Sequence, residues 1–506
     1  MPPSLREAIQ NLIHTKDEKS RSGRIEEDED AIALLEESEK DVPSGRGTPV
    51  PEASTPSSIR LRYIVLGLAG VFLLLAASAF AFKSPRRLLE GISASTELSD
   101  TNVDRDNHYF HLVIPGTSDS SADFCKTVLS GAVLNYPTPW AIVYDTGNKT
   151  NTTYSKIERV SAWMNRMPED HDEDIVAVIG NPLSWFQVRP DVFIQRYFDV
   201  RKRRGRRLVE QFTTETRLKQ DITARIVFSS ELKCSLQDAS ECLGVQAEDG
   251  STHFLNTGVA VGPLEDMREL WKHATAKANE TILSGQAVDE DVVFTSLLRR
   301  QVEHRELIKT SPAAKLASEL SFTDRSEFGI SLDFGRELSY AADDTLEGVE
   351  WVKHPKGKTS LMKLPKDIAA SQPPFWSYNK SLELPLETSW NQVPFLTGIK
   401  ENIIPSIVQR GPSADVELGK TWWEKMWFQP HGRKLLDNFA QTRFGPIALV
   451  TGEDGRPHRF WSPHREKVGI KTGNNKFCTF NSTCGFGEDW REVFLDEGGP
   501  WADPRP

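Results

Sequence analysis

Three consecutive acids, Asp289, Glu290 and Asp291, stand directly before the apolar run VVFTSLL. A carboxylate held at this position can accept a proton from a substrate hydroxyl or orient an acceptor group. The same acids can instead cap a helix, because acidic side chains in a first turn satisfy free backbone N–H groups and the helix dipole. The triplet is therefore a candidate catalytic base, with helix capping as the alternative.

A second candidate site follows the apolar run IVAVI at 175–179. This run predicts a buried strand, and Gly180, Asn181 and Pro182 end it. Open α/β sheets bind their ligands at the carboxyl ends of the strands, so the loop from Gly180 is expected to carry chemistry. The stretch GNPLSWFQVRP nevertheless contains no acid, histidine or cysteine. The acids at 170–174 precede the strand and are expected at its opposite end.

The elements that must position these residues alternate between strand and helix. Apolar runs predict strands at 109–114, 140–145, 175–179, 224–230 and 253–262. Helical spacing of apolar side chains predicts helices at 121–136, 191–200 and 263–274, and one that starts at the capping box Ser155-Lys-Ile-Glu158. Such alternation predicts an α/β fold, a three-layer Rossmann-type sandwich with a mostly parallel sheet, over 106–445. Residues 446–506 are expected to pack on this domain as a C-terminal extension.

The chain begins with two segments that do not belong to this fold. Residues 1–58 hold 13 acids against 7 Lys or Arg and no aromatic residue, which predicts a disordered acidic tail. The run Tyr63–Phe82 has 20 residues without a charge, enough for a helix to cross a bilayer. A polar segment precedes it, so we interpret 59–83 as an uncleaved signal anchor, followed by a stem at 84–105.

Sequons and cysteines favour a type II orientation, with the tail in the cytosol and the bulk of the chain in the lumen of the Golgi or endoplasmic reticulum. All five cysteines follow the anchor, and Cys234 with Cys242 and Cys478 with Cys484 can close short disulfide loops, which leaves Cys125 over. Five Asn-x-Ser/Thr triplets also follow it. They begin at Asn148, Asn151, Asn279, Asn379 and Asn481.

Charge and motifs exclude several classes. The formal net charge of -11 argues against nucleic acid as a partner. The sequence has no Walker or GxGxxG loop, no HExxH, no GxSxG and no zinc-type CxxC pair. Dehydrogenases and hydrolases therefore lose their usual sequence support. Sugar transfer and sugar binding remain as the leading classes for an α/β domain in the secretory lumen.

Four stretches taken in order resemble one family. CKTVLSGAVLNYPTPWAIVYD, DEDIVAVIGNPLSWFQVRPDVFIQRY, FLNTGVAVGPLEDMREL and WWEKMWF are similar to fungal single-anchor membrane proteins with a GT-A-type glycosyltransferase domain. These are distantly similar to the glycosyltransferase domains of procollagen-modifying enzymes. The resemblance implies a nucleotide-sugar donor, a glycan or glycoprotein acceptor, and donor contacts from Asn256, Thr257 and Gly258. A simple end of a strand is the alternative for these three residues.

Families of this type commonly hold Mn²⁺ or Mg²⁺ with a DxD-like acidic pair and a late histidine. The acidic pair falls where this chain has Gly180-Asn-Pro-Leu183, and the histidine where it has Gln409-Arg410. Both sets of ligands have been lost, and the amide of Asn181 is a poor replacement for a carboxylate. The resemblance therefore implies a donor site that no longer fits a divalent metal.

Two interpretations remain for such a site. In the first, transfer proceeds without metal and guanidinium groups neutralise the departing diphosphate, with Arg189, Arg410 and the run RKRRGRR at 201–207 as candidates. The run can equally be a solvated helix face. In the second, the domain is inactive and binds a glycan or a partner glycosyltransferase. Three tryptophans, Trp422, Trp423 and Trp427, can serve as a sugar platform or, more simply, as core.

Overall fold

The computed structural model describes residues 107–116, 121–144, 152–180, 183–236, 238–310, 325–342, 348–355, 362–376, 382–410, 421–441, 445–452, 455–464, 466, 468–484 and 492–495. All of them belong to one compact unit, Asp100–Pro506. The tail, anchor and stem expected at 1–105 lie outside these residues. Within the described ranges, no helix has both the length and the apolar character to cross a bilayer.

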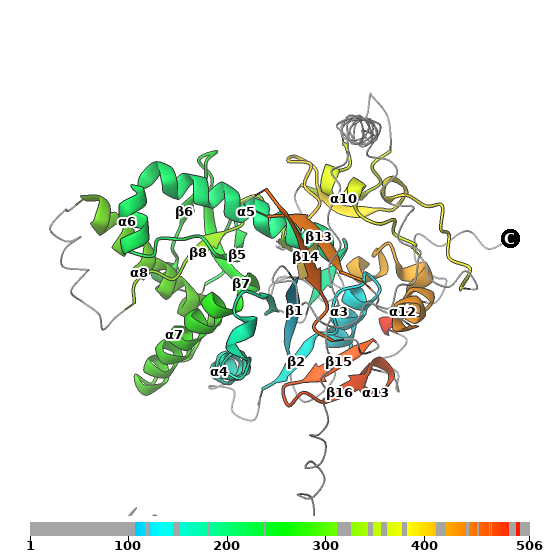
Figure 1. The fold of residues 1–506 in the computed structure, drawn as a ribbon, viewed down its shortest axis with the longest axis horizontal. Coiled ribbons are helices and arrows are strands. Elements are labelled where there is room, and N and C mark those ends of the chain that lie inside the picture. The colour runs from blue at the N-terminus through cyan, green and yellow to red at the C-terminus, as the bar shows by residue number, and fades with distance from the viewer. Residues whose placement is uncertain are drawn as a thin grey trace, which may run out of the picture. The chain divides into compact units, whose positions relative to one another are not determined.

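The centre of this unit is a mixed, mostly parallel sheet, which confirms the expected α/β class (Figure 1). Strand β7 runs antiparallel to both β3 and β5, and β16 runs antiparallel to β15, whereas the other neighbours in the main path are parallel. In spatial order the strands are β16 (Phe477–Thr479), β15 (Gly469–Thr472), β2 (Trp140–Val143), β1 (Asn107–Gly116), β3 (Ile175–Ile179), β7 (Thr252–Pro263), β5 (Ile226–Glu231) and β8 (Ile330–Leu332).

The C-terminal residues are part of this sheet. Strand β15 lies parallel to β2, with Lys471 opposite Trp140. Strand β14 (Pro457–Trp461) lies parallel to the start of β1 and antiparallel to β13 (Ala448–Thr451). The segment after 445, expected as an extension on the domain, therefore supplies strands to the sheet itself.

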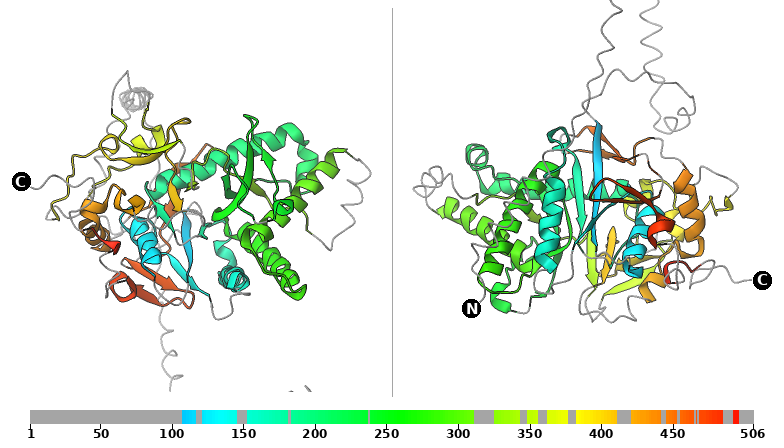
Figure 2. Two further views of the ribbon diagram at one scale, coloured as in Figure 1. Left: turned by 180° about the vertical axis from the view of Figure 1, so that it is seen from behind. Right: turned by 90° about the horizontal axis from the view of Figure 1, so that it is seen from below.

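Helices cover both faces of the sheet (Figure 2). The buried apolar side chains form a separate core on each face. Along β1, Phe110, Leu112 and Ile114 belong to one core, whereas Val113 belongs to the other, as the alternation of a strand requires. The first face carries α3 (Ala122–Ala132), α5 (Pro190–Gln211) and α12 (Gly432–Gln441), and the second carries α4 (Thr152–Met164), α7 (Leu264–Leu283) and α8 (Glu290–Thr310).

Smaller elements complete the unit. Strand β12 (Ile407–Arg410) lies between β4 (Ser184–Phe186) and β9 (Ser339–Ala342), and β10 (Val349–Val352) pairs with β11 (Phe395–Gly398). The others are α6 (Thr214–Lys219), β6 (Val245–Gln246), α10 (Lys366–Ala370), α13 (Phe480–Cys484) and the 3-10 helices η1 (Glu169–His171), η2 (Ala239–Glu241), η4 (Trp390–Gln392) and η5 (Gln429–His431).

Local signals placed the helices well but not their ends. The helix expected from Ser155 begins at Thr152, so Ser155 lies inside the first turn and does not cap it. Pro263 directly precedes α7 as its N-cap. Helix α5 continues far beyond Val200 and includes the whole basic run RKRRGRR.

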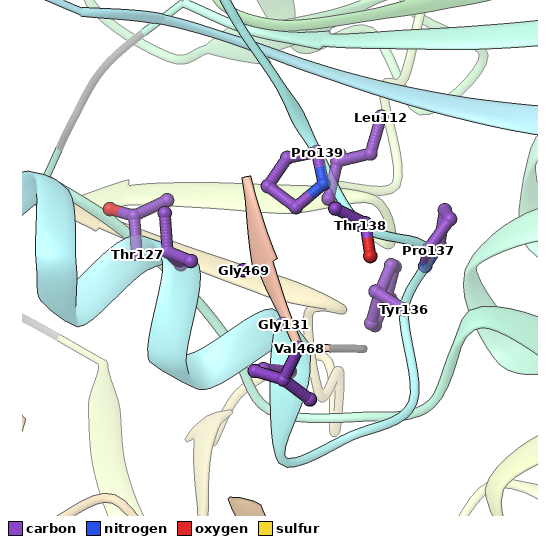
Figure 3. A pocket seen from close by; sticks show the side chains of 11 residues that line it. Leu112, Thr127, Gly131, Tyr136, Pro137, Thr138, Pro139, Val468 and Gly469 are labelled. Atoms are coloured by element: carbon purple, nitrogen blue, oxygen red, sulfur yellow. The ribbon is translucent and has the colours of Figure 1, made fainter. Parts of the chain in front are cut away.

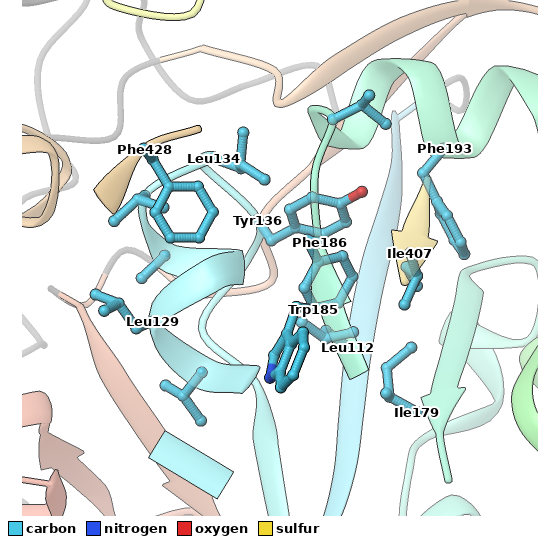
Figure 4. Close-up of a cluster of buried hydrophobic side chains, with 14 of the residues drawn as sticks. Leu112, Leu129, Leu134, Tyr136, Ile179, Trp185, Phe186, Phe193, Ile407 and Phe428 are labelled. Atoms are coloured by element: carbon cyan, nitrogen blue, oxygen red, sulfur yellow. The ribbon is translucent and has the colours of Figure 1, made fainter. Parts of the chain in front are cut away.

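The aromatic stretch after Leu183 forms core. Trp185, Phe186 and Gln187 are each at most 1% exposed, and Figure 4 shows Trp185 and Phe186 among apolar side chains from several elements. The Gln187 amide nitrogen donates to the carbonyl oxygens of Leu396 and Pro405 at 3.2 and 2.7 Å. This stretch therefore anchors the loop and exposes no side chain to a ligand.

The described residues contain two disulfides, and one differs from expectation. Cys234 pairs with Cys242 as predicted. Cys484 pairs with Cys125, and Cys478 is free, so the expected Cys478–Cys484 bond is wrong. The reason is tertiary: α13 packs against α3 and brings Cys484 to a cysteine 359 positions away in the sequence.

Candidate functional site

Segments distant in sequence meet at the carboxyl end of β3. The N–H of Gly180 donates to the carbonyl oxygen of Gly258 at 2.9 Å. A Cβ atom at Gly180 would clash with the carbonyl oxygen of Thr257, and one at Gly258 would clash with the side chain of Gln409. Only glycine allows so close an approach at these two positions. We call the residues gathered here the strand-end site: Lys156, Gly180, Asn256, Thr257, Gly258, Glu290, Asp291 and Gln409.

Lys156 places a cation at this site. Its ammonium nitrogen, from α4, donates to the carbonyl oxygen of Gly180 at 2.7 Å and forms an ion pair with Glu290. The side chains of Lys156 and Glu290 are 12% and 15% exposed. Lys156 was not predicted as a site residue, because a lysine in the first turns of an amphipathic helix carries no local signal of what it will contact.

The acidic triplet divides between two roles. The exposed Asp289 caps α8, since its carboxylate accepts the N–H of a residue three positions later at 3.3 Å. Asp291 accepts the N–H and the hydroxyl of Thr257 at 2.9 and 2.6 Å. Burial raises the pKa of Glu290, and the opposing effect of the Lys156 charge is smaller. Burial likewise raises the pKa of Asp291, although the hydrogen bonds from Thr257 act to lower it. Glu290 and Asp291 are thus the acids that reach the site.

The three residues expected to contact the donor lie together. The Asn256 side-chain oxygen accepts the N–H of Gly258 at 2.8 Å. The Asn256 amide nitrogen bonds to Glu231, the last residue of β5. This arrangement holds Asn256, Thr257 and Gly258 in fixed positions beside the end of β3.

Strand β12 brings the position of the expected late histidine to the same place. Gln409 lies opposite Ser184 in the antiparallel pair of β12 and β4. The side-chain nitrogen of Gln409 and the hydroxyl of Ser184 are buried and lack a hydrogen-bond partner among the described residues. Because buried polar groups are nearly always hydrogen-bonded, these two atoms mark a place for a polar group. Asn181, also expected to contact the donor, lies outside the described residues.

Arg189 is not a phosphate ligand. Its guanidinium group is buried, donates to the carbonyl oxygens of residues 372, 373 and 374 at 2.7–3.2 Å, and lies over the ring of Trp390. Through these hydrogen bonds the planar guanidinium group holds the loop at 372–374 against the start of α5. The expectation that Arg189 binds the donor is therefore corrected, because a saturated and buried guanidinium cannot also reach a ligand.

Three of the six basic residues in the run on α5 are paired with acids. Arg203 bonds to Glu337 at 2.8 Å, and Arg204 and Arg207 both contact Glu248, at 3.4 and 2.6 Å. This supports the alternative of a partly solvated helix face over a phosphate site. Arg410, in contrast, lies half-buried at the end of β12, and its backbone N–H donates to Leu183 at 3.0 Å, directly beside the loop that follows β3.

The described residues also line a cavity of about 370 Å³. Its lining includes Leu232, which directly follows Glu231, together with Arg336, Tyr340 and Lys400. Ligand pockets commonly have volumes of about 300–1,000 Å³, so the cavity has room for a sugar or part of a nucleotide. The pocket in Figure 3 is different, because it holds only about 10 Å³. Its lining is mostly apolar, for example Leu112 and Pro139, and contains no acid, histidine, lysine, arginine or cysteine.

The tryptophans are core. Trp422, Trp423 and Trp427 are each at most 3% exposed. The indole N–H of Trp427 donates to the backbone oxygen of Gln187 at 3.0 Å, and that of Trp423 donates to the oxygen of Val493 at 3.2 Å. A sugar platform requires exposed ring faces, so the simpler alternative holds for all three.

The donor set of the strand-end site does not fit a divalent metal. Mg²⁺ and Mn²⁺ bind oxygen ligands, chiefly carboxylates. Here Glu290 is paired with the ammonium of Lys156, Asp291 accepts two hydrogen bonds from Thr257, and Gln409 supplies an amide. An ammonium group occupies the end of β3, where the resemblance places the metal.

Two of the five expected glycosylation sites can be located. Asn279 on α7 and Asn481 on α13 are both exposed. Asn148, Asn151 and Asn379 lie outside the described residues. Glycosylation at these positions stays a prediction.

Comparison with models of known protein families and with curated proteins finds no match to this chain.

Proposed function

We propose that the chain is a glycosyltransferase with a GT-A-like domain, which takes a sugar from a nucleotide donor without a divalent metal and transfers it to a glycan or glycoprotein. One observation carries the proposal. The two sequence positions where the resemblance expects metal ligands, near Gly180 and at Gln409, lie together, and the ammonium of Lys156 lies beside them. A fixed cation at this point provides the positive charge that a departing diphosphate needs.

The side chains suggest a division of roles. Lys156 and Arg410 neutralise the diphosphate as the bond between the anomeric carbon and its phosphate oxygen breaks. Asn256 and Thr257 position the sugar. When the diphosphate attracts Lys156, the paired Glu290 carboxylate is released and accepts the proton of the acceptor hydroxyl, whose oxygen forms the new bond. The raised pKa of Glu290, caused by burial, suits a base that must hold this proton.

The test is calorimetric titration of the full chain, purified in detergent, with nucleoside diphosphates and nucleotide sugars in Mn²⁺ and in EDTA. We expect binding that persists in EDTA, weakens at least tenfold in Lys156→Met and stays unchanged in Lys272→Met. Lys272 is a suitable control because it lies on the exposed face of α7. Binding that requires Mn²⁺, or equal binding by both variants, would contradict the proposal.

A second function rests on a separate observation. Both buried carboxylates of the site are already engaged, Glu290 by Lys156 and Asp291 by Thr257. A domain that keeps donor binding but has no free base would act as an inactive homologue that binds a glycan or a partner enzyme. Donor binding without transfer or donor hydrolysis would favour this alternative.

The location belongs to the same proposal. We infer that 63–82 anchors the chain in the membrane of the Golgi or endoplasmic reticulum, with residues 106–506 in the lumen. Exposed sequons at Asn279 and Asn481 support this orientation. Removal of N-glycans should increase the electrophoretic mobility of the chain, and an unchanged mobility would argue against a lumenal domain.

A further inference from the structure

A cluster of two histidines and one aspartate lies away from the strand-end site, before the start of β3. His111 comes from β1, His171 ends η1, and Asp174 directly precedes β3. One ligand atom from each lies within 4.8 Å of the others. The acids at 170–174 were expected at this end of the strand, but no histidine was expected beside them.

The geometry brings three metal-ligand atoms to one point. The Nε2 atom of His111 and the Nδ1 atom of His171 lie 2.9 and 2.6 Å from the same oxygen of Asp174. The other Asp174 oxygen accepts the N–H of Tyr109 at 2.8 Å, which fixes the carboxylate. Oriented carboxylates of this kind are typical of metal ligands.

We propose that His111, His171 and Asp174 bind a transition-metal ion such as Zn²⁺. Two imidazoles and one carboxylate form a donor set that suits this ion, and three protein ligands leave a fourth position for water. His171 has a side chain that is 28% exposed, so solvent can reach this position, whereas His111 and Asp174 are 1% and 6% exposed.

The observed arrangement differs from a coordinated one by shifts of the ligand atoms, which now lie within 4.8 Å of one another. Ligand atoms of a tetrahedral zinc ion, at bond lengths of about 2.0–2.2 Å, lie about 3.3 Å apart. The two nitrogens must therefore retreat from Asp174 by roughly half an ångström. His171 can provide most of this movement, because it lies on a short surface 3-10 helix.

Charge around the cluster favours a cation. The segment 169–174 reads EDHDED, and Arg268 pairs with Asp172 at 2.6 Å. Glu169, Asp170 and Glu173 are exposed. These acids add negative charge around the Asp174 carboxylate.

The test uses zinc alone, without donor or acceptor. The full chain, with any purification tag removed and treated with EDTA and then dialysed, is titrated with Zn²⁺ by calorimetry, and its melting temperature is measured with Zn²⁺ and with EDTA. We expect one bound ion per chain at micromolar affinity or tighter, and a melting temperature raised by zinc.

Two variants separate metal binding from structural hydrogen bonding. His171→Gln should weaken zinc binding at least tenfold and abolish the thermal shift. His273→Gln, which changes a similarly half-buried histidine paired with Glu269 at 3.3 Å, should behave as the wild type. No zinc binding by the folded wild type, or equal affinities of the two variants, would overturn the proposal and leave a hydrogen-bonded cluster. Because no donor is present, failure here is independent of the strand-end site.

Discussion

Asp333 provides a quantitative test of the packing around β8. The residue directly follows this strand and is completely buried. One carboxylate oxygen accepts the N–H of Leu338 at 2.7 Å, and the other has no partner in the described part of the chain. Burial, with a contribution from the nearby Glu337, raises the pKa of Asp333 from 3.8 to about 7.

The folded chain should become less stable as pH rises, because it binds the Asp333 proton more tightly than the unfolded chain does. The unfolded chain releases the Asp333 proton near pH 3.8 and the folded chain near pH 7, so the unfolded state gains relative stability as pH rises through this interval. The contribution of Asp333 to folding is therefore fully present below pH 3.8 and is lost by about pH 7. Between pH 5 and pH 8 this loss amounts to about 2–3 kcal/mol, because one pKa unit corresponds to about 1.4 kcal/mol.

The perturbation is Asp333→Asn, which resembles the protonated acid and cannot ionise. Urea unfolding at pH 5 and pH 8 should show that the variant gains about 2–3 kcal/mol relative to the wild type over this range. Asp437→Asn, at an exposed position of α12, serves as the control and should show no such gain. A difference between Asp333→Asn and the wild type that is equal at both pH values would refute the assignment of a neutral, buried carboxyl group.

Three further predictions concern packing. Arg189→Met should lower the free energy of unfolding by about 3–5 kcal/mol in urea titration, because three loop carbonyl oxygens, one of them in a buried hydrogen bond, lose the donors of a buried guanidinium group; a loss below about 1 kcal/mol would mean that Arg189 is not structural. Cys484→Ser should lower the free energy of unfolding by about 2–5 kcal/mol in the same measurement, and Cys478→Ser should lower it much less, since Cys484 closes a long disulfide loop and Cys478 is free. A larger loss for Cys478→Ser than for Cys484→Ser would favour the Cys478–Cys484 bond that was first expected. Gly258→Ala should lower the free energy of unfolding by about 1–3 kcal/mol, because the added methyl group would clash with the side chain of Gln409. In thermal unfolding, the double variant Gly258→Ala with Gln409→Ala should recover part of this loss. If the effects of the two substitutions on stability simply add, the contact does not exist.

Strands and helices of the central unit could be predicted from local patterns. The run IVAVI is a buried strand, and the apolar stripe of 263–274 lies on a helix that begins at Leu264. The period of apolar residues reports which face of an element is buried, and this is a local property. The reversed direction of β7 and the insertion of β14 and β15 have no local signal, since they depend on which strands become neighbours.

The candidate site was predicted only in part. Asn256, Thr257, Gly258 and the acids of α8 do gather at the end of β3. Arg189 and the pairing of Cys478 were assigned wrongly, because charge and sequence proximity say nothing of burial or tertiary contact. Lys156 was missed for the same reason, since its role depends on a strand end and an acid that lie far away in the sequence.

The sheet cannot be completed until late in synthesis, because two of its C-terminal strands pair with its first two strands. Strands β1 and β2 leave the ribosome early, yet their neighbours β14 and β15 come from the last part of the unit. Cys484 is made 359 residues after its partner Cys125, which at about 5–20 residues per second takes roughly 20–70 s. Throughout this time the outer edge of β2 has no partner, and an open strand edge invites association with other chains. The growing chain should therefore depend on chaperones until β14 and β15 have been made, and closure of Cys125–Cys484 should report that they have joined the sheet.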